Sequence, residues 1–280
     1  MRSWRRAVSM PLQIRMPDLP ETARVVVVTR PRAQADALAQ AVSANGRTAV
    51  LLPLLEISPV EDAAPLRAAL AELDRFALVA FVSPNAIDAA FAHIDAWPSA
   101  VPVAIVGDGS RAALARHGVT GDAFTIFSPA DSAHSDSEHL LQRLDLASYA
   151  GTRVLIVRGD GGRELLADAL RAAGARVEPV AAYRRATPVL TGELATRLRA
   201  LLAQPNDWII TSSEALRGLA GLVRSMDGDD DDLLMRCLMQ QRFIVPHARI
   251  AQTARDLGLD HVCLTGSGDA RLLAALQLQE

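Results

Sequence analysis

Two arginines flank a glycine-rich turn near the middle of the chain. The turn Gly159-Asp160-Gly161-Gly162 lies between Arg158 and Arg163 and directly follows the apolar run 154–157. Glycines allow backbone N–H groups to converge, and a helix that begins after such a turn presents its positive end. This arrangement favours a carboxylate or phosphate ligand. A plain strand-to-helix crossover without a ligand fits the local pattern almost as well.

The elements around this turn form a strand–turn–helix–strand unit. The run 154–157 has the length and β-branching of a buried strand, and apolar residues recur at helical spacing from Glu164 to Ala173. Gly174 is placed to end that helix in a left-handed conformation, and 177–183 is the next strand.

The composition excludes several kinds of chemistry. All 29 residues counted as lysine or arginine are arginine, which rules out a Schiff-base lysine, a pyridoxal phosphate attachment and a P-loop lysine. The net charge of −3 gives no general attraction to nucleic acid. Cys237 and Cys263 form no CxxC pair, and the six histidines lack metal-ligand spacing, so we expect no metal.

The N-terminal residues 1–22 are basic but lack the continuous apolar segment of a signal peptide, and we interpret them as a disordered extension. No apolar run approaches the ~20 residues of a membrane helix. We therefore expect a cytoplasmic protein that does not enter a membrane.

The order of motifs in the first half returns in the second half. Residues 25–53 correspond to 154–183, residues 77–91 to 207–221, and residues 103–119 to 242–259. The spacing agrees, since Arg30 and Ser83 are 53 residues apart and Arg158 and Ser212 are 54 apart. The acidic segment 227–232 reads as a solvated insertion. Strand–helix alternation throughout predicts α/β domains with parallel sheets, whose ligands bind beyond the carboxyl ends of the strands.

Short motifs follow one another from about Arg24 to the C-terminus, and their order is more specific than any one of them. They are Thr29-Arg30-Pro31, Val82-Ser83-Pro84-Asn85-Ala86, Ile105-Val106-Gly107, Asp136-Ser137-Glu138, the run 157–166, Ala182-Tyr183-Arg184-Arg185, Thr211-Ser212-Ser213-Glu214-Ala215-Leu216 and His247-Ala248-Arg249-Ile250-Ala251. In this order they resemble the uroporphyrinogen-III synthase family, lyases that close linear hydroxymethylbilane with loss of water while inverting its terminal pyrrole.

The resemblance implies two flavodoxin-like, doubly wound parallel-sheet domains joined by a two-stranded extended linker. One domain would comprise 23–54 and 188–280, and the other 55–187. It further implies that the protein acts in tetrapyrrole biosynthesis without a cofactor, as a monomer, with a transient contact to the preceding enzyme of the pathway. Asp108 stands where family members often have proline, and its charge argues against direct contact of that turn with a polyanion.

Tyr183 is the predicted catalytic residue, because it occupies the family's tyrosine position and a phenol can donate a hydrogen bond to the leaving hydroxyl. A tyrosine that only packs at a domain edge is the alternative. Hydroxyls, amides and guanidinium groups at the strand-to-helix corners are predicted to bind the substrate carboxylates, although helix capping and intraprotein ion pairs compete with this role. These predicted substrate-binding residues are Arg30, Ser83, Asn85, Gly107, Arg158, Gly161, Gly162, Arg163, Thr211, Ser212, Ser213, His247 and Arg249.

Two other functions compete with the lyase. A cytosolic two-domain protein could close on a small anion without catalysis. A nucleotide-dependent enzyme could use the glycine turn, but GDGG is not GxGxxG and no GKS or GKT loop occurs.

Overall fold

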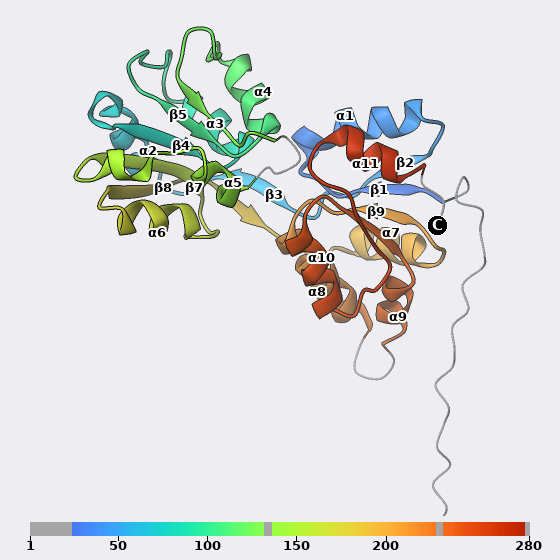
Figure 1. The fold of residues 1–280 in the computed structure, drawn as a ribbon. Helices are drawn as coiled ribbons and strands as arrows, with labels where there is room; N and C mark the ends of the chain where they lie inside the picture. The colour runs from blue at the N-terminus through green and yellow to red at the C-terminus, as the bar shows by residue number, and fades with distance from the viewer. Residues whose placement is uncertain (1–23, 132–135, 228–231, 278–280) are drawn as a thin grey trace, which may run out of the picture.

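Two β-sheets organise the chain, and each is the centre of one lobe in the computed structural model, which describes residues 24–131, 136–227 and 232–277 (Figure 1). The first lobe is built on the sheet β11-β10-β9-β1-β2, and the second on the sheet β3-β8-β7-β4-β5-β6. All strand pairs are parallel except β3 with β8 among the residues described. The predicted α/β class with parallel sheets is therefore confirmed.

The first lobe takes its elements from both ends of the chain. Its strands are β1 (Val26–Val28), β2 (Ala49–Leu51), β9 (Asp207–Ile209), β10 (Arg242–Val245) and β11 (Val262–Leu264). Its helices are α1 (Arg32–Ala44), α7 (Gly192–Leu202), α8 (Ser213–Asp227), α9 (Leu233–Met239), α10 (Ala248–Asp256) and α11 (Asp269–Ala275).

The second lobe is continuous in sequence. Its strands are β3 (Glu56–Pro59), β4 (Leu78–Phe81), β5 (Val103–Ile105), β6 (Ile126–Phe127), β7 (Arg153–Gly159) and β8 (Arg176–Ala186). Its α-helices are α2 (Ala64–Leu70), α3 (Pro84–Phe91), α4 (Asp108–Arg116), α5 (Ser137–Leu141) and α6 (Leu165–Ala172), with 3₁₀ turns at Leu73–Arg75 and Leu146–Tyr149.

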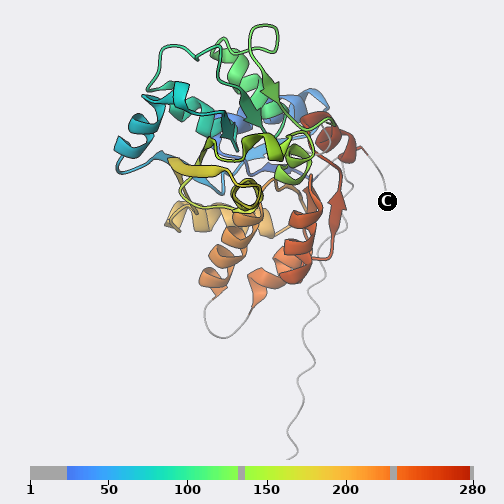
Figure 2. The ribbon, with the colours of Figure 1, turned by 60° about the vertical axis from the view of Figure 1, so that its left-hand side comes forward.

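Both sheets are covered on both faces, as the doubly wound pattern requires (Figures 1 and 2). In the first lobe, Val27 and Trp208 face α7, α8, α9 and α10, whereas Val26 and Ile209 face α1 and α11. In the second lobe, α2, α3 and α4 cover one face and α5 and α6 the other. Apolar runs such as 154–157 are buried because the side chains on each face of the sheet pack against the helices that cover that face.

The strand orders agree with the internal repeat. The matched segments place β1 with β7, β2 with β8, β9 with β4 and β10 with β5, and these strands occupy equivalent places in the two sheets. In chain order the first sheet reads 2-1-3-4-5, the flavodoxin-like order. The second sheet, apart from β3, has the same order once its chain is read from β7. Each sheet therefore has one switch point, between β1 and β9 and between β7 and β4.

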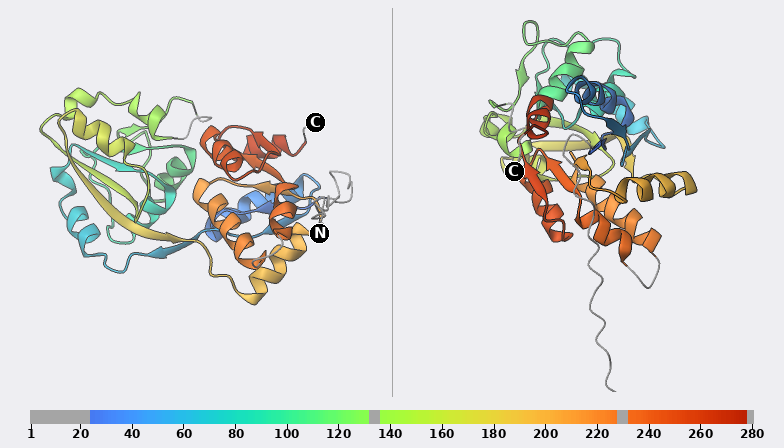
Figure 3. Two further views of the ribbon diagram at one scale, coloured as in Figure 1. Left: turned by 90° about the horizontal axis from the view of Figure 1, so that it is seen from below. Right: turned by 90° about the vertical axis from the view of Figure 1, so that its right-hand side faces the viewer.

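Two extended segments run between the lobes. Residues of β3 pair antiparallel with the end of β8, with Glu56 opposite Ala186 and Pro59 opposite Tyr183. Figure 3 shows the two segments side by side in its left view. Tyr183 thus lies on the strand that leads from one lobe toward the other.

Local hydrogen bonds define the starts of two helices in the second lobe. The segment 107–110 forms the first turn of α4, because the amides of Ser110 and Arg111 donate to Gly107 O at 3.0 and 3.1 Å. Helix α5 is capped by Asp136, whose Oδ1 accepts a hydrogen bond from the His139 amide at 2.8 Å. Ser135, the N-terminal extension 1–22 and most of the acidic insertion lie outside the described residues.

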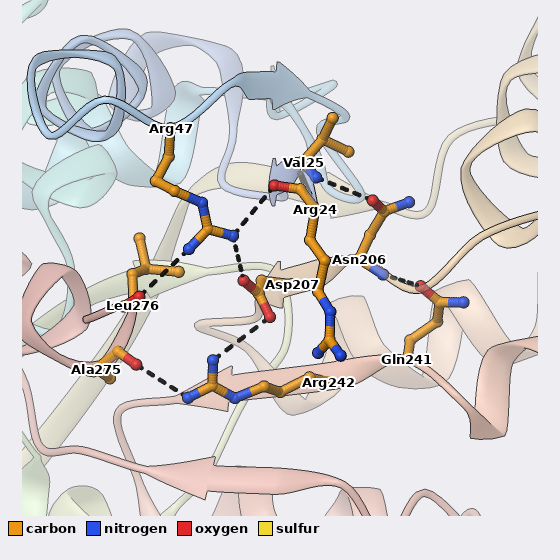
Figure 4. A network of polar contacts seen from close by, with 9 residues as sticks. All are labelled: Arg24, Val25, Arg47, Asn206, Asp207, Gln241, Arg242, Ala275 and Leu276. Atoms are coloured by element: carbon orange, nitrogen blue, oxygen red, sulfur yellow. Dashed lines mark hydrogen bonds and ion pairs between the residues drawn. The ribbon is translucent and has the colours of Figure 1, made fainter. Parts of the chain in front are cut away.

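A buried ionic network closes the end of the first sheet opposite to the strand-to-helix corners (Figure 4). Asp207 is fully buried at the start of β9, with Oδ2 2.6 Å from Arg47 Nη2 and Oδ1 3.5 Å from Arg242 Nη1. Arg47 also donates to the carbonyls of Arg24 and Leu276 at 3.1 and 3.2 Å. These contacts tie the start of the sheet to the segment after α11.

Candidate active site

The switch point of the second sheet brings Tyr183 to the corner between β4 and α3. Ser83 caps α3, with its Oγ accepting the Ala86 amide at 3.2 Å. The same Oγ donates to Tyr183 Oη at 3.0 Å. When Ser83 is the donor in this contact, the Tyr183 proton stays available for another acceptor. The Tyr183 residue is 5% exposed, so its ring belongs to the core and its hydroxyl lies at the corner.

The glycine turn follows β7 beside Tyr183. Gly161 and Gly162 are exposed, and Gly162 has a φ of 137°, a conformation that favours glycine. Gly174 has a φ of 91°, which confirms the predicted left-handed end of α6. Arg158, at the end of β7, reaches past the turn to Glu164 at 2.6 Å.

The three arginines predicted to bind carboxylates each pair with a carboxylate of the protein. Arg30 lies 2.7 Å from Asp269, Arg158 pairs with Glu164, and Arg163 pairs with Glu138. The partner side chains are 44–46% exposed, so solvent reaches all three pairs. An ion pair this exposed is worth at most about 1 kcal/mol, and a substrate carboxylate could exchange with it.

The corner of the first lobe carries hydroxyls at the start of α8. Ser212 Oγ accepts a hydrogen bond from the Ala215 amide at 3.3 Å, and Ser213 Oγ accepts one from Thr253 Oγ1 of α10 at 3.1 Å. Thr211 lies half-buried two residues after the end of β9. Gly107, the equivalent corner residue before α4, is extended with a φ of 169° and is followed by the exposed Asp108.

Two hydrogen bonds join the corners of the two lobes. Asn85 Oδ1, in the first turn of α3, accepts Gln34 Nε2 of α1 at 3.0 Å. His247 Nε2, at the cap of α10, lies 2.9 Å from Asp136 Oδ2 at the cap of α5. The predicted site residues Asn85 and His247 are therefore brought to the opposite lobe.

Asp136 and Gln34 were missed by the sequence analysis. Asp136 was named from the sequence only as part of the motif Asp136-Ser137-Glu138, without a role of its own. The Asp136 side chain is 4% exposed and also accepts His139 Nδ1 at 2.7 Å. Burial acts to raise the pKa of Asp136, but hydrogen bonds from the His139 backbone and from both histidine side chains outweigh it and lower the pKa to about 2.

Replacing Asp136 with asparagine is expected to change the acid sensitivity of the fold. Since the folded pKa of about 2 lies below the ordinary 3.8, the carboxylate stabilises the protein above pH 4, and this contribution disappears as the pH falls from about 4 to 2. The contribution is about 2 kcal/mol. Urea unfolding at a series of pH values should therefore show a smaller decline for Asp136→Asn over this range. The exposed Asp168→Asn should decline as the parent does, and an equal decline for Asp136→Asn would contradict the assignment.

Arginines from both lobes gather beside the Asp136–His247 contact. Desolvation lowers the pKa of Arg249 on α10, and the positive charges of Arg163 and Arg217 lower it further, whereas Glu138 and Asp136 raise it. Arg217, on α8, was not identified from the sequence because it lies one residue beyond the motif 211–216. Guanidinium groups gathered in this way can bind the carboxylates of a polyanionic ligand.

No three or more His, Cys, Asp or Glu side chains come together as a potential metal site within the described residues. Both cysteines are free thiols. Within the same part of the chain, no helix has the length and apolar character needed to cross a membrane.

The fold and the site define a class: a two-lobed, doubly wound α/β protein whose hydroxyl- and arginine-bearing corners meet between the lobes. Residues 36–266 match the family model described as uroporphyrinogen-III synthase HemD. The chain is 34% identical to uroporphyrinogen-III synthase of Salmonella typhimurium over 259 residues, covering 90% of this chain and 99% of that protein. It is 33% identical to the Escherichia coli protein of the same name, with 90% and 99% covered.

Solved structures of the same name share the fold. The uroporphyrinogen-III synthetase of Helicobacter pylori matches with a TM-score of 0.57 at 15% identity, covering 91% of this chain and all of that one. A mutant Thermus thermophilus uroporphyrinogen III synthase matches with a TM-score of 0.56 at 16% identity, covering 90% and 97%. The chain belongs to the uroporphyrinogen-III synthase family, the lyase-type cyclising enzymes of tetrapyrrole synthesis.

Proposed function

We propose that this protein closes hydroxymethylbilane to uroporphyrinogen III, and that Tyr183 assists the departure of the substrate hydroxyl. The observation that supports this role is the hydrogen bond of 3.0 Å in which Ser83 donates to Tyr183 Oη. It leaves the phenol proton as the donor that a leaving hydroxyl needs, at the switch point where ligands of this fold class bind.

The reaction requires little covalent chemistry from the protein. The lone pair of a pyrrole nitrogen expels hydroxide from the hydroxymethyl carbon, and the Tyr183 proton stabilises the oxygen as the carbon–oxygen bond breaks. The substituted carbon of the terminal ring adds to the resulting electrophilic azafulvene and gives a spiro intermediate. The bond between that carbon and its original bridge carbon then breaks, and the bridge carbon rejoins at the free position of the ring with loss of a proton, so that the ring is inverted. No cofactor is needed, because holding the chain coiled can supply up to ~7–11 kcal/mol of the barrier.

The carboxylates of the substrate are proposed to bind at the corners of both lobes. Arg30, Arg158 and Arg163 would exchange their exposed protein partners for substrate carboxylates, which accept bidentate hydrogen bonds from guanidinium. The remaining binding groups are proposed to be the hydroxyls, amides and side chains of Ser83, Asn85, Gly107, Gly161, Gly162, Thr211, Ser212, Ser213, His247 and Arg249.

We propose that the two lobes are separate domains, 23–54 with 188–280 and 55–187, that move apart to admit the substrate. The hydrogen bonds Gln34–Asn85 and His247–Asp136 support this proposal. Both join the lobes through predicted site residues, so they would have to open before the substrate could reach those residues. The predicted monomer, cytoplasmic location and contact with the preceding enzyme stay predictions.

The proposal is tested by incubating the protein with fresh hydroxymethylbilane and separating the oxidised porphyrin isomers. Uroporphyrin III should dominate at low protein concentration. If only the type I isomer of spontaneous closure formed, the proposed activity would be rejected, and tight binding without turnover would favour the anion-binding alternative.

A further inference from the structure

Arg185 lies where the glycine turn, the strand of Tyr183 and the other lobe meet. Its Nη2 donates to Gly161 O at 2.9 Å, and its backbone amide donates to Asp160 Oδ1 at 3.3 Å. Its Nη1 lies 3.3 Å from Glu214 Oε2, in the first turn of α8. One side chain therefore connects the turn of the second lobe with the first lobe.

The guanidinium and the Tyr183 ring are both packed against Gly159. A methyl group at Gly159 would lie 3.1 Å from Tyr183 Cζ and 3.3 Å from Arg185 Nε, closer than most real contacts of a Cβ atom. Gly159 does not have a positive φ, so its backbone would accept alanine. Gly159 must therefore lack a side chain because Tyr183 and Arg185 lie so close to it, and not because of its backbone conformation.

A β-bulge gives Tyr183 its direction. Arg158 pairs with Ala181, but the next residue, Gly159, pairs with Tyr183, so Ala182 is passed over. Bulges next to active sites redirect side chains. This bulge lies directly before the glycine turn, whose Gly161 carbonyl accepts a hydrogen bond from Arg185. Asp160 completes the link, since its amide donates to Tyr183 O at 2.9 Å.

Helix α8 also meets the end of this segment one turn further along. A Cβ atom at Gly218 would lie 2.7 Å from Thr187 Oγ1, so the helix and the chain after β8 are in close contact. Glu214 and Gly218 are four residues apart and lie on one face of α8. The Arg185–Glu214 pair is thus part of a packed junction.

We propose that Arg185 is a positioning residue that ties the setting of the Tyr183 phenol to the placement of α8 in the other lobe. The inference rests on the role proposed above for Tyr183. Arg185 acts on the reaction by holding Tyr183 and the glycine turn in position. Because Arg185 also pairs with Glu214, the position of the phenol depends on how the two lobes meet.

The test is a pair of double-mutant cycles on the full chain, with kcat and KM measured for hydroxymethylbilane. Arg185→Met should lower kcat about 10- to 100-fold and change KM less, since a misplacement of about 1 Å has this effect. In the Tyr183→Phe background the same change should lower kcat less than twofold, because groups that act as a unit are not additive. Glu214→Gln should lower kcat about two- to fivefold, and not at all in the Arg185→Met background.

Two further variants separate positioning from loss of folding. Gly159→Ala keeps the Arg185 side chain but places a methyl group against both the phenol ring and the guanidinium, so it should lower kcat as Arg185→Met does while circular dichroism shows the fold retained. Arg176→Met, exposed at the start of the same strand, should match the parent. The proposal is overturned if Arg185→Met keeps kcat within twofold, if its effect is equal with and without the phenol, or if Glu214→Gln is silent. A silent Tyr183→Phe would instead reject the role of Tyr183, and Arg185 with it.

Discussion

Replacing Tyr183 with phenylalanine is expected to lower kcat about 10²-fold or more while the fold persists. Donation of a proton or hydrogen bond to a leaving group contributes about 10²- to 10⁴-fold. Tyr183→Phe keeps the ring that packs in the core of the second lobe and removes only the oxygen that accepts from Ser83. Loss of that hydrogen bond should reduce the free energy of unfolding by about 1 kcal/mol.

The product isomers give a second measurement of this effect. When turnover slows, more hydroxymethylbilane closes spontaneously, so the type I fraction should rise in proportion. Tyr149→Phe is the matched control, because Tyr149 is the other of the two tyrosines, is also buried, and packs on the opposite face of the second sheet. Equal kinetics for Tyr183→Phe and Tyr149→Phe would remove the proposed catalytic role and leave Tyr183 as a packing residue.

The sequence predicted the parts of this molecule that depend on local pattern. Apolar runs predicted the buried strands, and small polar residues predicted the corners. The repeated order of motifs indicated an internal duplication, and the equivalent strand orders of the two sheets agree with it. Because the carboxyl ends of parallel strands share one edge, the alternation of strands and helices also predicted that these turns lie where ligands bind. The strand order that puts Ser83 and the glycine turn at one switch point came from the structure.

The contacts that the sequence did not predict join residues far apart in the chain. His247 and Asp136 are 111 residues apart, and their hydrogen bond depends on how the two lobes meet. Arg185 was read only as part of a family motif, because its partners Gly161 and Glu214 lie on different elements. The partners of Arg30, Arg158 and Arg163 could not be chosen among the 32 acidic residues without coordinates.

Removing one partner from the buried ionic network should strongly destabilise the first lobe. Asp207→Ala is expected to lower the free energy of unfolding by about 3–5 kcal/mol, because it leaves the buried Arg47 guanidinium without its carboxylate. The backbone carbonyls of Arg24 and Leu276 cannot neutralise that charge. A change of this size is a large fraction of the total stability of an ordinary domain.

Urea unfolding measures this effect, with the exposed carboxylate variant Asp168→Ala as the control, which should change the free energy of unfolding by less than about 1 kcal/mol. Asp207 lies at the start of β9, whereas Thr211 and Ser212 follow the end of that strand. Folded Asp207→Ala should therefore keep the parent's kcat at low temperature. A loss of kcat without a loss of stability would mean that the network acts on the corners of the sheet, and a stability equal to the parent's would mean that Arg47 finds solvent or another partner.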